Sequence, residues 1–325
     1  MESKICDLFG IKYPIIQGGI QWLATPEFCA AVSNAGCLGT LNSSLFANRE
    51  ELLNGIAKVR SLTKNPFAVN ISMLPVQVAG EKTDEFLDAC AQSKVPVVEL
   101  AGRDPGPFVG KLHDAGVKVI HKSTAVRFAK KAEAAGCDAV SIVGFEAGGH
   151  PGMDDVSTMV LIPSVVDAIH VPVIAGGGIC DSRSYLAARA LGAEGVVMGT
   201  RFVATVECPI HENFKKLFVE CDERSTVMVQ RSIKNASRNI KNATMKELLA
   251  LEASSDHPLT LEEILPFTNG KRQKAAYISG NIDDGAIPAG ECIGCIHDIL
   301  TVKEVVANII NGADNIIDSW QKSMK

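Results

Sequence analysis

The sequence predicts an α/β fold: a (β/α)8 barrel, or TIM barrel, with a smaller, mainly helical C-terminal domain over the barrel mouth. Two observations support this prediction. Alanine-rich helical segments end on a glycine or a proline, and β-prone residues begin almost at once. Eight strand starts of this kind lie before residue 200, near residues 15, 38, 67, 96, 117, 138, 172 and 195. Their intervals, roughly 20–35 residues, suit βα units with short loops.

Two residue types mark the junctions between helix and strand. Glycine adopts the left-handed conformation past a helix end at little cost, and we expect it at Gly36, Gly116, Gly136 and Gly192. Proline stops the helix at three other junctions, which are Pro66, Pro96 and Pro172. The strand runs, such as 97–100 and 117–120, are short and mostly apolar, as in strands covered on both faces. Eight successive units favour a closed barrel over an open, doubly wound sheet.

The character of the sequence changes beyond about residue 205. Residues 209–265 lack the strand pattern and predict helices rich in Lys, Arg, Glu and Asn, including 212–218 and 245–252. A loop-rich stretch with several glycines follows, and a last amphipathic helix is expected from about Val302 to Met324. We therefore predict a (β/α)8 barrel over 1–208, a helical substrate or lid domain over 209–290, and a C-terminal segment, 291–325, that returns to the barrel.

Composition excludes several classes of function. The chain has 325 residues, 46% of them hydrophobic, and a net charge of −5 with both signs interspersed, so no nucleic-acid or membrane partner is expected. The N-terminus has neither the basic start nor the apolar core of a signal peptide. Ten cysteines without such a signal predict reduced thiols in a cytoplasmic protein. Cys292 and Cys295 have CxxC spacing, but no second pair accompanies them, and we interpret them as structural.

Three glycine-rich stretches follow predicted strands at the end of the barrel where active sites lie. The first, residues 144–150, ends in His150. The others occupy the loops after strands seven and eight, where this fold commonly binds phosphate. Glycine there lets backbone N–H groups approach the ligand closely. The predicted phosphate-site residues are Gly176, Gly177, Gly178, Met198, Gly199 and Thr200. Tight βα turns without a ligand explain one such stretch, but they explain three poorly.

Two side chains at the predicted mouth are candidates for a catalytic or cofactor-binding role. His150 is placed to act on whatever the phosphate anchors, and the alternative is a histidine that only hydrogen-bonds its own glycine-rich turn. Lys122 follows strand five, where a Schiff-base role competes with a lysine that hydrogen-bonds a cofactor, and we favour the latter. A catalytic metal usually takes three protein ligands, and the predicted rim has too few, so no metal site is expected.

These motifs together resemble the nitronate monooxygenase family, also called 2-nitropropane dioxygenases. The resemblance covers almost the whole chain. It rests on residues 14–18, 30–36 with 38–39, and 66–70 in the first part of the barrel. It continues with residues 146–150 and Gly152, which are similar to the family's most diagnostic motif, and with 175–179 and 191–202 at the phosphate-binding end. The family comprises FMN-dependent (β/α)8-barrel flavoenzymes, and it includes FMN-containing enoyl-acyl-carrier-protein reductases and NAD(P)H:quinone reductases.

The resemblance implies roles for particular residues. His150 would be the catalytic base or an electrostatic partner of the substrate. The residues implied for FMN binding are Gly18, Gly19, Asn70, Lys122, Ala147, Gly148 and Gly149, with Gly177, Gly178, Gly199 and Thr200 at its phosphate. The family usually continues its opening glycine with proline and methionine, where this chain departs. Its own residues, implied to face the substrate, are Ile20, Gln21 and Trp22.

The resemblance implies an FMN-dependent oxidoreductase, and it leaves the reaction open. In the nitronate monooxygenase reading, an alkyl nitronate reduces the flavin and dioxygen completes an oxidative denitrification. In the reductase reading, NAD(P)H reduces the flavin and an enoyl thioester or quinone accepts the hydride. Residues 231–239, expected to be helical, favour the first reading. A non-flavin phosphate-binding lyase or isomerase and a non-catalytic binding protein are more distant alternatives. A homodimer is the expected assembly.

Overall fold

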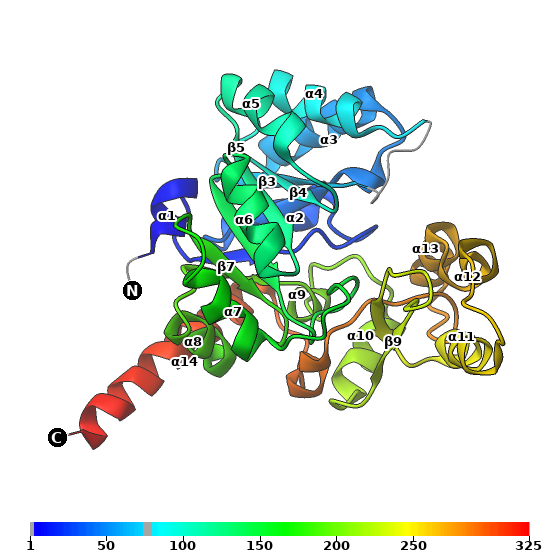
Figure 1. Cartoon of the computed structure of the whole chain (residues 1–325). Helices are drawn as coiled ribbons and strands as arrows, with labels where there is room; N and C mark the ends of the chain where they lie inside the picture. The colour runs from blue at the N-terminus through cyan, green and yellow to red at the C-terminus, as the bar shows by residue number, and fades with distance from the viewer. Residues whose placement is uncertain (1–2, 74–79, 325) are drawn as a thin grey trace.

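The computed structural model describes residues 3–73 and 80–324, and eight parallel strands form one barrel within them (Figure 1). The strands alternate with helices along the chain, as the recurring junctions predict. They begin within one residue of the expected positions. Their bounds are β1 Ile15–Gln17, β2 Gly39–Asn42, β3 Phe67–Ser72, β4 Val97–Ala101, β5 Lys118–Ser123, β6 Ala139–Val143, β7 Val173–Gly176 and β8 Gly195–Met198.

The barrel closes through hydrogen bonds between its first two strands. The sheet order runs β1-β8-β7-β6-β5-β4-β3-β2, with every neighbouring pair parallel. The remaining seam is joined by Leu38, whose N–H donates to the carbonyl of Ile15 (3.0 Å) and whose carbonyl accepts from Gln17 (2.9 Å). The prediction of a (β/α)8 barrel rather than an open sheet is therefore confirmed.

Helices surround the barrel and meet the next strand through left-handed glycines. Gly36, Gly116, Gly136 and Gly192 all have φ between 78° and 96°, as expected past a helix end. The helices of this part are α1 Lys4–Phe9, α2 Pro26–Asn34, α3 Arg49–Leu62, α4 Thr83–Ser93, α5 Gly106–Asp114, α6 Val126–Ala134, α7 Thr158–Val166, α8 Ser182–Ala190 and α9 Thr200–Val203, with a 3-10 turn at Ser43–Leu45.

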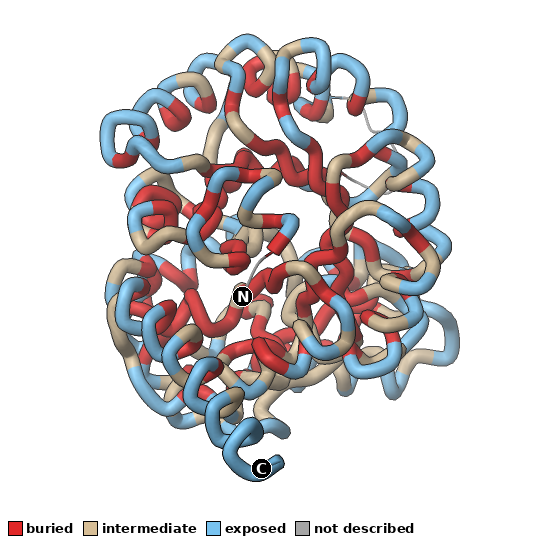
Figure 2. The backbone as a smooth tube through the Cα atoms, turned by 90° about the vertical axis from the view of Figure 1, so that its left-hand side faces the viewer, coloured by how far each residue is buried: buried red, intermediate tan, exposed pale blue. Residues whose placement is uncertain are grey.

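The barrel interior is apolar at one end and polar at the other. Apolar residues from seven of the strands, with Leu38 just before β2, form the lower layer, and α1 covers it with Ile5 and Phe9. Side chains on a strand face the same way every two residues. The residues two or four positions further along therefore line the mouth, and they are polar: Asn42, Asn70, Glu99, Lys122 and Ser141. Figure 2 shows buried positions gathered at the centre, and exposed positions on the outer side of the coils around it.

The C-terminal part contains a β-hairpin that the sequence interpretation missed. Strands β9 Thr226–Val229 and β10 Ser237–Ile240 pair antiparallel, so the prediction of helices throughout 209–265 is wrong there, and residues 231–239 are a turn leading into β10. A four-residue strand with the polar sequence Ser-Arg-Asn-Ile has no apolar alternation to reveal it. The helices are α10 Glu212–Glu220, α11 Ala243–Ser254, α12 Leu261–Thr268 and α13 Gly270–Ser279.

This C-terminal part has an apolar cluster of its own. Side chains from β9, α11 and α12 form it, including Val229, Met245, Leu248 and Ile264. Figure 1 shows β9 and α10–α13 together on one side of the barrel. The domain limits at 208/209 and 290/291 stay a prediction, and residues 1, 2, 74–79 and 325 of those ranges lie outside the described residues.

The chain ends in a long helix that packs on the barrel's outer layer. After a 3-10 turn at Glu291–Cys295, α14 runs over Val302–Ser323, close to the expected range, and contacts α8 and α2. Its N-cap Thr301 and Glu304 form a capping box, in which the side chain of each residue accepts a hydrogen bond from the backbone N–H of the other. Among the described residues, no helix combines the length and apolarity needed to cross a membrane.

We expect Phe9→Ala to destabilise the barrel strongly, because Phe9 is 5% exposed and covers the interior from below. Removal of a buried phenyl ring costs about 3–5 kcal/mol of unfolding free energy. Urea unfolding followed by circular dichroism measures this loss. Leu62→Ala, at a side chain that is 39% exposed on α3, is the control and should change stability little. Equal effects of the two substitutions would contradict the proposed role of α1.

Candidate functional site

A buried network of polar side chains occupies the barrel mouth. Nδ2 of Asn70 donates to Oε2 of Glu99 (2.6 Å), and Oδ1 of Asn70 accepts from Nδ2 of Asn42 (3.1 Å). Asn42 also donates to the carbonyl of Gly19 (3.0 Å), which fixes the loop after β1. These three side chains are 1–3% exposed. Their hydrogen bonds offset the cost of burying polar groups in the barrel.

Glu99 is the residue of this network that sequence reasoning missed. Burial raises the pKa of its carboxyl, while the nearby charge of Lys122 and the hydrogen bond from Asn70 lower it by less. The signal was present in the sequence, because Glu99 is the one charged residue in the apolar run of 97–100. A carboxylate in a strand covered on both faces indicates a site, since its burial needs a specific partner.

Lys122 brings a positive charge to the mouth. Within residues 3–73 and 80–324 its side chain makes no ion pair or hydrogen bond, although its charge lies close enough to Glu99 and His150 to shift the pKa of each. His150 is exposed to solvent, although many protein atoms lie around its imidazole. Burial first, and the charge of Lys122 second, lower the pKa of His150 to about 4. His150 is therefore neutral near pH 7.

The loop that carries His150 is bound to the C-terminal part. Gly149 exchanges two backbone hydrogen bonds with Arg238 of β10 (3.0 and 2.7 Å). The Arg238 guanidinium donates to the carbonyl of Phe145 (3.1 Å), stacks over its ring, and pairs with Glu291 (2.8 Å). A Cβ on Gly148 would lie 2.7 Å from the backbone of Ala289–Gly290. Gly148 is thus required by contact with the protein's own chain.

The glycines after β7 and β8 divide into structural and open positions. A Cβ on Gly176 would meet Val143 and Val197 inside the barrel. Gly177 and Gly178 have left-handed φ angles of 93° and 71°, which side chains rarely adopt. A Cβ on Gly199 would meet nothing within 4 Å, so open space lies beside it. Gly199 thus has the space that a phosphate at this loop needs.

The other predicted site residues play different structural parts. The side chain of Met198 is buried, and its carbonyl accepts from the N–H of Gly18 (2.9 Å). Thr200 accepts through Oγ1 from the N–H of Gly290 (2.9 Å). Ala147 packs on the barrel interior. The structure therefore does not bring the Met198 side chain to the mouth.

The loop after β1 meets the C-terminal part rather than standing free. A Cβ on Gly19 would collide with the Asn70 side chain. Trp22 has a φ of 65°, an unusual conformation for a bulky residue, and its indole N–H has no acceptor among the described residues. Lys274 of α13 lies over its ring (5.0 Å), and a Cβ on Gly270 would touch it at 3.2 Å. Gln21 is exposed, while Ile20 is half-buried against the core.

Comparison with known proteins identifies the family. A model of the family described as nitronate monooxygenase matches residues 2–312. The chain belongs to this family. FabK from Thermotoga maritima is similar to it in structure, with a TM-score of 0.90, 33% identity and 99% of both chains covered. A nitroalkane oxidase from Streptomyces ansochromogenes, at 24% identity and a TM-score of 0.82 over 97% of this chain and 99% of its own, shares the fold.

Curated relatives in the family have more than one activity. A carboxyl-CoA dehydrogenase of Rhodococcus jostii, named for a hydroxy-methyl-oxo-octahydroindene substrate, is 31% identical over 98% of both chains. A protein of Staphylococcus aureus named probable nitronate monooxygenase is 31% identical over 97% of this chain and 98% of its own. The chain is accordingly an oxidoreductase of a flavoenzyme family.

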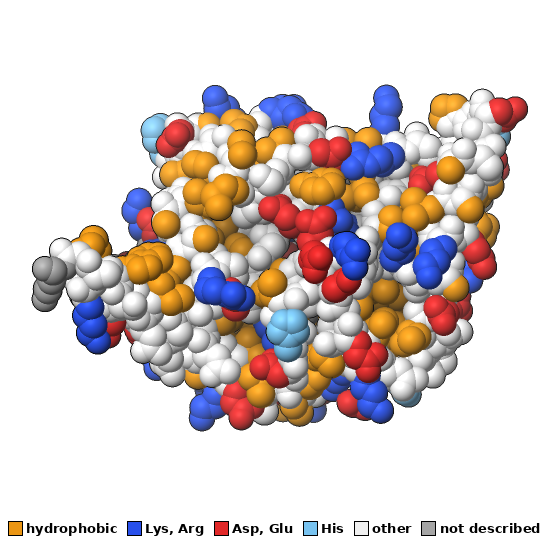
Figure 3. All heavy atoms as spheres, turned by 90° about the horizontal axis from the view of Figure 1, so that it is seen from below, with side chains coloured by type: hydrophobic (Ala, Val, Ile, Leu, Met, Phe, Trp, Pro, Cys, Tyr) orange, Lys and Arg blue, Asp and Glu red, His pale blue; other side chains and the backbone are white. Residues whose placement is uncertain are grey.

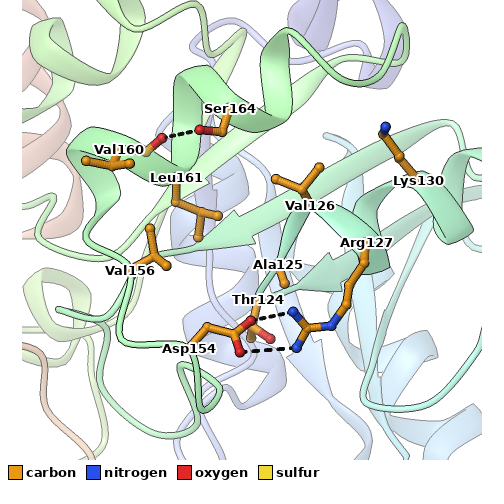
Figure 4. Close-up of a pocket in the computed structure, with 10 residues that line it drawn as sticks. All are labelled: Thr124, Ala125, Val126, Arg127, Lys130, Asp154, Val156, Val160, Leu161 and Ser164. Carbon is orange, nitrogen blue, oxygen red and sulfur yellow. Dashed lines mark hydrogen bonds and ion pairs between the residues drawn. The ribbon is translucent and has the colours of Figure 1, made fainter.

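A separate pocket of about 590 Å³ lies outside the mouth, between α6 and α7 (Figure 4). Its lining is mostly apolar, with Val126, Val156 and Leu161, and a two-point ion pair joins Arg127 to Asp154. Figure 3 shows charged side chains of both signs spread over one face of the molecule. In the described part of the chain, no group of three or more His, Cys, Asp or Glu residues is arranged to hold a metal.

We expect Lys122→Gln to raise the pKa of His150 from about 4 toward its ordinary value of about 6.5. The ammonium disfavours a second positive charge on the ring, so its removal favours protonation, while burial still holds the pKa below the ordinary value. A pH titration of the histidine ring signals by NMR measures this change. Lys130→Gln, a charge removed from α6, is the control. An unchanged or lower pKa in Lys122→Gln would refute the coupling.

Proposed function

We propose that this protein is an FMN-dependent oxidoreductase with its cofactor in the barrel mouth. Gly199 has open space beside it, as phosphate binding at this loop needs. The N–H groups of Gly178 and Gly199 donate to no acceptor among the described residues, so they are free to bind phosphate oxygens. Lys122 supplies a positive charge for the cofactor or the substrate. Bound FMN would supply reversible hydride and electron transfer, which no side chain of the protein provides.

We propose an acyl thioester of the coenzyme A type as the substrate, oxidised or reduced at its α,β-bond. The arrangement that carries this proposal is His150 close to the charge of Lys122, which together with burial lowers the pKa of the imidazole to about 4. Hydride transfer at the β-carbon places negative charge on the thioester oxygen, and hydrogen-bond donors and cations stabilise that charge. The similarity to the carboxyl-CoA dehydrogenase supports the choice.

Oxidation of an alkyl nitronate is the second candidate, and the Staphylococcus aureus relatives favour it. Lys122 would attract the anionic nitronate. A histidine with a pKa of about 4 is a poor base for a neutral nitroalkane, because a general base works best with a pKa near the operating pH. In this candidate the protein therefore takes the preformed nitronate. Membership of an oxidoreductase family argues against the phosphate-binding lyase or isomerase.

Gly199→Ala should weaken FMN binding without disturbing the barrel. The added methyl meets no protein atom within 4 Å, and the φ of −109° at this position suits alanine. It enters the space proposed for the phosphate, and lost hydrogen bonds to a charged group lower affinity roughly 10–100-fold. Fluorescence titration of the apoprotein with FMN measures the affinity. Gly110→Ala, another open glycine on α5, is the matched control. Unchanged FMN affinity in Gly199→Ala would place the phosphate elsewhere.

Anaerobic stopped-flow spectroscopy of the FMN-loaded protein should separate the two substrates. If the thioester proposal holds, crotonyl-CoA reoxidises flavin that NADH or NADPH has reduced, and propyl-2-nitronate does not reduce the oxidised flavin. The reverse pattern would replace the thioester by the nitronate.

His150→Gln should slow the reaction of the thioester about 10²–10³-fold, the usual loss when one donor to a developing charge is removed. The rate of flavin reoxidation by crotonyl-CoA measures it. His170→Gln, at an exposed histidine in the loop that enters β7, is the control. Equal rates for the two variants would remove His150 from the mechanism.

A further inference from the structure

The turn of the β9–β10 hairpin places an amide beside His150. Nδ2 of Asn235 lies 3.3 Å from Nε2 of His150, although the two residues are 85 positions apart in the sequence. An amide nitrogen carries two hydrogens and donates, whereas a neutral imidazole has one donating and one accepting nitrogen. The geometry therefore defines which ring nitrogen has the hydrogen.

The hairpin turn holds the amide in a fixed position. Gln230 and Lys234 both adopt left-handed backbone conformations, with φ angles of 66° and 54°. The N–H of Asn235 donates to the carbonyl of Gln230 (3.2 Å), and the N–H of Gln230 donates to the carboxylate of Glu252 (2.8 Å). Non-glycine residues keep such conformations only where surrounding contacts hold them. Asn235 thus stands on a constrained turn, as a positioning group needs.

The loop of His150 contacts the same hairpin through residues before and after His150 in the sequence. Gly149, just before it, pairs with the backbone of Arg238. Asp155, five residues after it, forms an ion pair with Arg231 (2.8 Å). The amide and the imidazole therefore belong to two segments that are joined at three points, and their relative position is fixed.

We propose that Asn235 is a positioning residue that holds His150 as the neutral Nδ1–H tautomer. Because Nε2 accepts the hydrogen bond from the amide, the ring hydrogen resides on Nδ1. His150 then presents an N–H donor to a substrate, and this purpose of the tautomer rests on the proposed function. Without Asn235, the ring is free to exchange its hydrogen between the two nitrogens.

The charges around the ring favour the neutral imidazole. Only this form has a single ring hydrogen, so only this form has two tautomers. Lys122 of β5 disfavours protonation of the imidazole. Two other cations of the hairpin are paired, Arg231 with Asp155 and Arg238 with Glu291, while Lys234 of the same turn is exposed to solvent. His150 thus keeps a single ring hydrogen at neutral pH, and its position depends on Asn235.

Long-range ¹H–¹⁵N NMR of the apoprotein tests the tautomer without any activity assay, because protonated and unprotonated ring nitrogens differ widely in chemical shift. His150→Gln identifies the signals of His150 among the seven histidines. We expect Nδ1–H in the wild type and a mixture of tautomers in Asn235→Ala. In Asn235→Asp, the carboxylate only accepts, so we expect Nε2–H and a raised pKa. Nε2–H in the wild type, or one tautomer in all proteins, would overturn the proposal.

Turnover of the FMN-loaded variants separates this proposal from the proposed function. Asn235→Ala should lower kcat roughly 5–10-fold, the effect of one lost hydrogen bond, with little change in KM. Lys241→Ala is the matched control, since Lys241 is an exposed residue just after β10 and lies outside the turn. A changed tautomer with unchanged kcat would support the assignment of Asn235 and overturn the role of His150 in the reaction. An unchanged tautomer with a lowered kcat would overturn the assignment.

Discussion

Two backbone hydrogen bonds between Gly149 and Arg238 hold the site together, because they join the barrel loop that carries His150 to the C-terminal part. The contacts around them follow from this pairing. The Arg238 side chain binds the carbonyl of Phe145 and the carboxylate of Glu291, and the backbone of Glu291 in turn donates to the carbonyl of Glu146 (3.0 Å). Each of these segments alone would leave buried backbone groups unpaired, which is costly. Together they satisfy one another over the mouth.

The same pairing gives the glycines of this region two distinct purposes. Gly148 and Gly290 have no side chain because the loop and the returning chain approach each other too closely for a Cβ. Gly149 and Gly199 have open space beside them instead. Gly148, Gly149 and Gly199 are alike in the sequence, where the family resemblance implies FMN binding for all three. Only the folded chain separates glycines that permit contact between chain segments from those that leave room for a ligand.

The barrel could be predicted from sequence because its signals are local. A left-handed glycine such as Gly136 and the apolar run after it lie within a few residues of each other, and each βα unit repeats them. The hairpin could not, since β10 is polar and gains its partners from β9 and from Gly149. The contact of Asn235 with His150 spans 85 positions, and no spacing rule reaches that far. Glu99 could have been predicted as a site residue, because it is the one charged residue in the apolar run of 97–100, but its partners could not.

The pKa values at the mouth are shifted mainly by burial, which acts there on an acidic group and on a basic group. Burial raises the pKa of the Glu99 carboxyl and lowers that of the His150 imidazole, so it favours the neutral form of both. Lys122 lowers both pKa values, and it opposes burial at Glu99 but reinforces it at His150. Burial and Lys122 therefore act in the same direction on the pKa of His150 and in opposite directions on the pKa of Glu99. A neutral donor beside a cation suits a substrate whose charge appears during the reaction, because neither group has to change its protonation state to stabilise it.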